Sequence, residues 1–176
     1  CLTRVVIRVL QTKISISRRA AATCFYAVLL APIFFLTSYI LLDAYTAGDQ
    51  RAYHKFYDAL KGSSLLQMML LARSYVSSSE PLSALILWVG SNLDINKNVY
   101  VSILNLSLML GIFTLARRYY VRGAMSFLML SNFYVIVLLT SAERLKIAVL
   151  IMVLAALCSG KTRLVLLALS PFAHVQ

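Results

Sequence analysis

Residues 123–160, GAMSFLMLSNFYVIVLLTSAERLKIAVLIMVLAALCSG, decide the fold of this chain. Two apolar segments, Ala124–Leu139 and Ile147–Cys158, flank the polar turn Thr140–Lys146. Both segments are too apolar for a soluble helix, so we expect two membrane-spanning helices joined by a tight turn. Arg144 falls in the first turn of the second helix, where the helix dipole disfavours a cation. We therefore expect an anion beside Arg144, which is either a functional ligand or simply Glu143 or a lipid phosphate.

The composition indicates an all-α, polytopic membrane protein. The 176 residues are 61% hydrophobic and 13% charged, with a mean hydropathy of +0.82, which excludes an ordinary soluble domain. A net charge of +11 would suggest nucleic acid as the partner of a soluble protein. In a membrane protein the same charge fits anionic lipid, so we expect no nucleic-acid partner.

The sequence contains no pattern typical of a cofactor or metal site. His54 and His174 are isolated, and no His/Cys cluster has zinc spacing. Ala155-x-x-x-x-Gly160-Lys161-Thr162 matches a permissive phosphate-loop pattern. Such a loop needs a preceding strand, whereas Ala155 ends an apolar helix, so we interpret Gly160 as a helix C-cap.

Charge divides the chain into two parts. Residues 1–20 carry five cations and no acid, which predicts a basic amphipathic segment on the cytoplasmic leaflet. Residues 21–176 form the integral membrane domain, in which Ala21–Leu42 is the first span and residues 43–98 are an outer loop of interfacial or re-entrant helices. The chain stops at Gln176 within an apolar segment, so we expect that it is truncated at its C-terminus.

The apolar helix Leu82–Leu93 determines the topology. Its twelve residues reach about 18 Å, short of a hydrocarbon core of about 30 Å, so we expect that it does not cross. The chain then has about five spans, the others being Val99–Ala116, Ala124–Leu139, Ala142–Cys158 and Leu164–Gln176. This arrangement places ten cations and no acid in the cytoplasm, and seven cations with all six acids outside. The positive-inside rule favours it over the model in which the helix crosses.

Four polar groups far apart in sequence then share the outer side: Asp49, Glu80, Arg144 and His174. Helical spacing also places Asp49 on one helix face with Tyr53 and Tyr57. Such a gathering of unlike polar groups is typical of a catalytic site. The alternatives are that Asp49 is a helix N-cap, that the tyrosines form an aromatic belt, and that His174 is a packing residue.

Four motifs, taken in order, resemble the EpsG/Wzy-type membrane polysaccharide polymerases. They are Gly48-Asp49-x-x-x-Tyr53-x-x-x-Tyr57, Glu80-Pro81, Arg144 within Ser141–Ala148, and Phe172-Ala173-His174. Ala142-Glu143 and Val175-Gln176 depart from the family's polar pair before the Arg and its aromatic-small pair after the His. Members of that family are longer, so the resemblance covers their N-terminal portion.

The resemblance implies a GT-C-like helix bundle in the bacterial inner membrane, with a cytoplasmic N-terminus. Its substrate would be a polyprenyl-diphosphate-linked oligosaccharide, whose repeat units it joins into exopolysaccharide, capsule or O-antigen on the outer face. Arg144 would stabilise the leaving diphosphate without a metal or other cofactor, and Asp49, Glu80 or His174 would accept the proton of the acceptor hydroxyl. The resemblance also implies these substrate-binding residues and partners: Tyr53, Tyr57 and Arg51; the lipid bilayer, a chain-length regulator and a flippase.

A second class of function fits the same outer polar groups. A non-enzymatic transporter or flippase subunit could use them to bind an anionic or lipid-linked substrate. Transporters place such groups at the bilayer midplane between broken helices, whereas here they are expected at one leaflet. The sequence therefore favours the enzyme.

Overall fold

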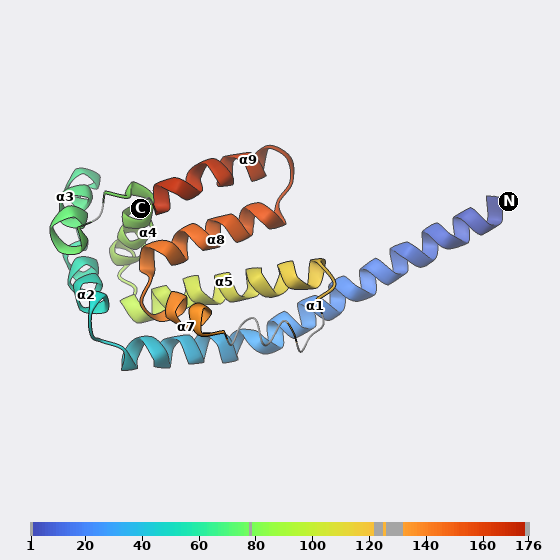
Figure 1. Cartoon of the computed structure of the whole chain (residues 1–176), viewed down its shortest axis with the longest axis horizontal. Coiled ribbons are helices and arrows are strands. Elements are labelled where there is room, and N and C mark those ends of the chain that lie inside the picture. Colours follow the sequence, from blue (N-terminus) through green and yellow to red (C-terminus); the bar gives the residue numbers. More distant parts are fainter. Residues whose placement is uncertain (1, 78, 122–124, 126–131, 175–176) are drawn as a thin grey trace.

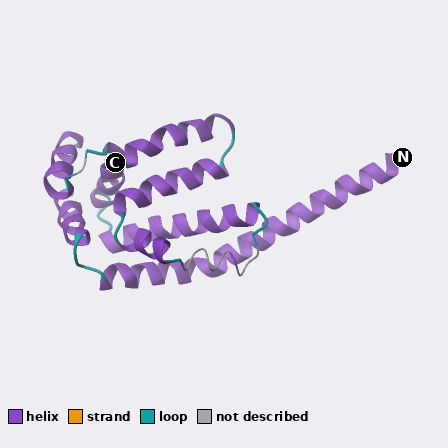
Figure 2. Cartoon of the chain, in the orientation of Figure 1, coloured by secondary structure: helices purple, strands orange, loops and turns teal. Residues whose placement is uncertain are grey.

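The computed structural model describes residues 2–77, 79–121, 125 and 132–174, and this part of the chain is built from helices without a β-strand (Figures 1 and 2). The all-α prediction is confirmed for these residues. The predicted segment Ala124–Leu139 lies partly outside them, and its described portion is the short helix α7 (Phe133–Thr140).

The longer helices lie side by side along the molecule, each contacting the next: α1 (Leu2–Ala44), α5 (Lys97–Arg118), α8 (Glu143–Leu157) and α9 (Gly160–Leu169) (Figure 1). Helix α1 passes through the predicted boundary at residue 20 without a break, since the sequence contains no Gly or Pro before Pro32. Its N-terminal part projects beyond the other helices. Helices α5 and α8 both begin at the end where α1 stops and run parallel to each other, while α1 and α9 run in the opposite direction (Figure 1).

Within the described residues, two helical segments are long and apolar enough to cross a membrane. They are Cys24–Ala44 and Lys97–Arg118, with mean hydropathies of 2.1 and 2.0. These two match the predicted spans Ala21–Leu42 and Val99–Ala116. Helix α8 has 15 residues and α9 has 10, which corresponds to about 22 Å and 15 Å of helix and falls short of a hydrocarbon core of about 30 Å.

Three short helices pack across the end of the row where α1 stops: α2 (Asp49–Ala59), α3 (Leu65–Val76) and α4 (Pro81–Asn92) (Figure 1). Their buried side chains form one core with the ends of α1 and α5, including Leu42, Phe56, Leu60, Leu87 and Val101. We call this group the cap. It corresponds to the predicted outer loop of short helices.

Helix α4 agrees with the predicted non-crossing helix in type and length. It has 12 residues, with Pro81 in its first turn and Glu80 at the N-cap. A Cβ atom on Gly90 would lie 2.5 Å from the ring of Tyr100 on α5, so only glycine permits this approach. The hydroxyl of Tyr100 donates a hydrogen bond to the carbonyl of Ile86 at 2.8 Å, which holds the ring against α4.

The last segments return the chain to the cap. Helix α9 begins at Gly160, whose φ of 61° is left-handed, and Cys158 is the C-cap of α8, so the interpretation of Gly160 as a C-cap was wrong. The 3-10 helix η1 (Ser170–Ala173) follows α9, and Ala173 is buried in a core with Ile147 and Ile151 of α8. This packing places His174 beside the first turn of α8.

Candidate functional site

The two ends of the bundle differ in charge. The acidic residues all lie at the cap end: Asp43, Asp49, Asp58, Glu80, Asp94 and Glu143. At the opposite end, the guanidinium of Arg118 donates hydrogen bonds to the carbonyls of Ala156 and Leu157 at 3.3 and 3.0 Å. Arg117, Lys161 and Arg163 lie at the same end. For the described residues, this is the charge separation predicted from the sequence; Arg122 lies outside them.

At the cap end, Arg144 of α8 forms an ion pair with Glu80 of the cap. Nη1 of Arg144 lies 3.0 Å from Oε2 and 3.3 Å from Oε1 of Glu80. The side chain of Glu80 is 4% exposed and that of Arg144 is 34% exposed. The carboxylate therefore orients the guanidinium from the protein side while part of the cation still faces solvent. Glu143, the alternative neutralising group on the same helix, pairs instead with two lysines.

Tyr53 on α2 is buried at 5% exposure and lies within hydrogen-bonding reach of Arg144. Burial raises the pKa of Tyr53 to about 12, and the charge of Arg144 opposes only part of this rise. Tyr53 therefore stays protonated at neutral pH. It serves as a hydrogen-bonding group rather than as a base.

His174 reaches the same cluster from the end of η1. Its Nδ1 lies 3.4 Å from Oε1 of Glu80, without the alignment of a hydrogen bond, so this buried nitrogen has no hydrogen-bond partner among the residues that the structure describes. Glu80 thus contacts Arg144 and His174 together. The sequence separates the three residues widely, and the fold brings them into one cluster.

An open pocket of about 270 Å³ lies in front of these groups. Four of the predicted site residues line it: Asp49, Tyr53, Arg144 and His174. A fifth, Glu80, borders it through its contacts with Arg144 and His174. Asp49 is the first residue of α2 and is exposed, while Gly48 occupies the N-cap, so the alternative of Asp49 as the N-cap was wrong.

Two predicted substrate-binding residues are not brought to this pocket. The hydroxyl of Tyr57 donates a hydrogen bond to the carbonyl of Ile95 at 3.0 Å, and the ring lines a separate pocket of about 560 Å³ with His54 and Lys97. Arg51 is exposed on α2 and lines neither pocket. Helical spacing predicted that Tyr53 and Tyr57 share one helix face, and both are buried, but the spacing does not tell which neighbouring helix each ring meets.

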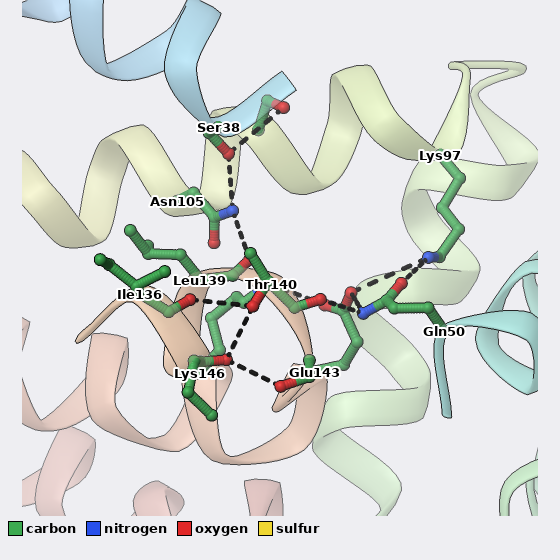
Figure 3. Close-up of polar contacts among 12 residues, drawn as sticks. Ser38, Gln50, Lys97, Asn105, Ile136, Leu139, Thr140, Glu143 and Lys146 are labelled. Carbon is green, nitrogen blue, oxygen red and sulfur yellow. Dashed lines mark hydrogen bonds and ion pairs between the residues drawn. The ribbon is translucent and has the colours of Figure 1, made fainter. Parts of the chain in front are cut away.

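Sequence reasoning missed a buried polar network behind the pocket (Figure 3). Nε2 of Gln50 donates to Oε1 of Glu143 at 2.8 Å, and Nζ of Lys97 donates to Oε1 of Gln50 at 2.6 Å. Nζ of Lys146 donates to Oε2 of Glu143 at 3.1 Å. We call Gln50, Lys97, Glu143 and Lys146 the buried network; all four residues are 5% exposed or less.

The sequence held one signal of this network. Glu143 and Lys146 are spaced i, i+3, which places them together on a helix surface. Nothing local connects them with Gln50 or Lys97. Glu143 also lines the pocket, so the network reaches the site itself.

Among the described residues, no group of three or more His, Cys, Asp and Glu side chains could hold a metal ion. Comparisons with protein-family models, with curated proteins and with solved structures find no match to this chain.

Proposed function

We propose that this chain is a membrane glycosyltransferase that polymerises polyprenyl-diphosphate-linked oligosaccharides. One observation carries the proposal: a single pocket gathers Arg144, Asp49, Tyr53 and His174, with Glu80 bonded to the arginine. A cation with two carboxylates and an imidazole suits a transfer in which a diphosphate leaves and a hydroxyl loses its proton. These are the residues that carry the resemblance to the EpsG/Wzy-type polymerases.

The membrane setting of the proposal is supported by the surface of the helices. Within the apolar segment Cys24–Ala44, helix α1 exposes a series of large apolar side chains: Val28, Leu29, Ile33, Leu36 and Ile40. Helix α9 likewise exposes Leu164, Val165 and Leu167. Such surfaces are suited to lipid contact. The proposal places the cap on the outer face of a bacterial inner membrane, with Cys24–Ala44 and Lys97–Arg118 crossing it. Helix α8 packs beside Lys97–Arg118 and α9 packs beside α8, but both are shorter than the hydrocarbon core.

In the proposed reaction, the hydroxyl oxygen of the acceptor sugar attacks the anomeric carbon of the donor. The bond from that carbon to the diphosphate oxygen breaks, and its electron pair leaves with the lipid diphosphate. Arg144 binds the departing diphosphate through its exposed guanidinium edge, where a bidentate cation is most effective in a poorly hydrated site. Tyr53 adds an aromatic wall and a hydrogen-bonding hydroxyl.

The proton of the acceptor hydroxyl passes to His174 or Asp49. Glu80 is less suited to this role because its carboxylate is 4% exposed and already pairs with Arg144. His174 lines the pocket while Glu80 lies beside its Nδ1, an arrangement in which a carboxylate favours the imidazolium that forms. Glu80 then acts on two groups, holding the cation for the leaving diphosphate and stabilising the base.

The transporter alternative receives less support from this geometry. The polar groups of the pocket lie where α1 ends and α8 begins, at one end of the bundle rather than halfway along its helices. Substrate sites of transporters lie near the bilayer midplane. A one-sided site is better suited to a reaction at the membrane surface.

Substitution of Arg144 by Lys tests the proposal, because it keeps the charge and removes the bidentate geometry. In cells whose polymer depends on this chain, R144K should lower the rate of polymerisation at least about tenfold, corresponding to about 1.4 kcal/mol of lost transition-state stabilisation, and so shorten the polymer. Lipid-linked single repeats should accumulate on the outer face. The matched control is R73K, which changes an exposed arginine of the cap outside the pocket. Normal polymer length in R144K would remove Arg144 from the mechanism.

A further inference from the structure

The turn between α7 and α8 leaves two carbonyl groups without helical partners, and side chains from elsewhere bond to both. The carbonyl of Leu139 accepts hydrogen bonds from Nζ of Lys146 at 2.9 Å and from Nδ2 of Asn105 at 2.9 Å. The carbonyl of Thr140 accepts one from Nε2 of Gln50 at 2.6 Å (Figure 3). The last carbonyls of a helix carry partial negative charge, so an ammonium group and amide donors are their natural partners.

Two of these side chains, Gln50 and Lys146, also bond to Glu143, which follows the turn. Its carboxylate accepts hydrogen bonds from Gln50 and Lys146, and Nζ of Lys97 lies 3.8 Å from Oε1. The buried network thus joins α2, α5 and the first turn of α8 around one carboxylate. Two pocket residues on these helices are next to a member of the network in sequence, since Asp49 precedes Gln50 and Arg144 follows Glu143.

We propose that Gln50, Lys97, Glu143 and Lys146 are positioning residues that fix the guanidinium of Arg144 against Glu80. The two lysines and Gln50 hold Glu143 on the protein side of α8, away from its neighbour Arg144. Arg144 therefore meets Glu80 as its carboxylate partner and directs its remaining exposed edge into the pocket. The catalytic consequence of this arrangement rests on the proposed function, but the geometry can be tested without it.

A purely stabilising role is a weaker account of these residues. Burying ionised groups costs free energy that their mutual attraction repays only in part, and apolar replacements of similar size often maintain stability. Position-specific hydrogen bonds to the turn are what an apolar replacement cannot reproduce. We therefore take the main role of the network to be holding the turn before α8, and with it Arg144, in place.

Arginine-specific modification by phenylglyoxal, resolved by mass spectrometry, measures the placement of Arg144 in the purified full chain. In the E143Q variant, modification of Arg144 relative to exposed Arg73 should accelerate about fivefold, the order expected for the net loss of one ordinary hydrogen bond. Arg118, which is bonded to α8 at the opposite end, should keep its wild-type rate. An unchanged rate at Arg144, or equal acceleration at Arg118, would overturn the proposal.

A second variant separates placement from stability. K97M/E143L/K146M removes every charge of the buried network together, so that no ion is left buried without a partner. We expect this variant to unfold within a few degrees of the wild-type temperature and still to show accelerated modification of Arg144. Wild-type protection in this folded variant would contradict a positioning role. If neither variant folds, the network is required for folding, and a role confined to positioning is also refuted.

The modification experiment and the R144K experiment fail independently. If R144K leaves polymer length normal while E143Q exposes Arg144, the proposed function fails and the positioning role stands. If R144K blocks polymerisation while E143Q leaves Arg144 protected, the proposed function stands and the positioning role fails.

Discussion

Glu80 and Arg144 are 64 positions apart in the sequence, and their side chains meet at 3.0 Å between Oε2 and Nη1. Glu80 occupies the N-cap of a short helix in the cap, and Arg144 lies in the first turn of α8. An arginine in the first turn of a helix faces the positive end of the helix dipole. The carboxylate of Glu80 compensates that repulsion and ties the cap to the longer helices.

This relationship predicts that E80Q destabilises the protein by about 1–2 kcal/mol. The lower part of the range for a charged hydrogen bond applies because Arg144 is one-third exposed and water screens part of the interaction. Equilibrium unfolding in detergent micelles measures the change. The control is D94N, which breaks the ion pair of Asp94 with Lys61. Both partners of that pair are largely exposed, so we expect a loss of at most about 0.5 kcal/mol. Equal losses of unfolding free energy in E80Q and D94N would show that the pair of Glu80 with Arg144 stabilises the protein no more than an exposed ion pair does.

The sequence predicted those parts of the fold that depend on local pattern. The length of the helix after Pro81 and its failure to reach across a bilayer follow from composition and rise per residue. The gathering of Asp49, Arg144 and His174 at one end follows from the alternation of helix direction, because a chain that reverses at each turn returns the same ends to one side. The full number of spans stays a prediction, since α8 is only 15 residues long.

The sequence could not predict the contacts between side chains that lie on different helices. Lys97 reads in sequence as a flanking cation of an apolar helix, yet it is buried beside Gln50 and Glu143. Tyr57 reads as a companion of Tyr53, yet it turns to the loop before α5. Tertiary packing decides both cases, and no spacing rule specifies the partner helix.

The close approach of α4 to α5 predicts that G90A destabilises the cap. The added methyl group would lie 2.5–2.6 Å from three ring atoms of Tyr100, whose hydroxyl is tethered to Ile86. We expect a cost of about 1–3 kcal/mol despite the higher helix propensity of alanine. The double variant G90A/Y100A tests the cause, because removal of the ring leaves no clash. If the methyl group costs as much in the Y100A background as in the wild type, contact with the ring is not the reason.

The environment of His54 predicts a dependence of stability on pH. Burial lowers the pKa of His54 below its ordinary value of 6.5, the charge of Lys97 lowers it further, and Asp58 and Glu143 oppose the change. Within the described part of the chain, its buried Nε2 has no hydrogen-bond partner. The unfolded chain therefore binds more protons near pH 6 than the folded chain does, and stability rises with pH through this range.

Acidification from pH 8 to pH 5 should accordingly destabilise the wild type more than the H54Q variant, as measured by the free energy of unfolding. The full stabilisation from neutral His54 is present above pH 6.5 and is lost as the pH falls through the lowered pKa. NMR titration of the His54 ring gives the midpoint directly. A midpoint at or above 6.5 would contradict the prediction.

The opposite charges of the two ends predict which side of the membrane each end faces. In a variant whose native cysteines are replaced, D94C places a thiol in the loop between α4 and α5, and K161C places one at the start of α9. If basic residues remain inside, a membrane-impermeant maleimide should label D94C in intact spheroplasts and K161C only in inverted vesicles. Both positions are exposed, so a difference in labelling reports sidedness rather than burial.

Labelling of both thiols from the same side would show that the row of helices does not stand across the bilayer, and the reversed pattern would place the Arg144 pocket in the cytoplasm. The reversed pattern would therefore exclude a polymerase acting on the outer face.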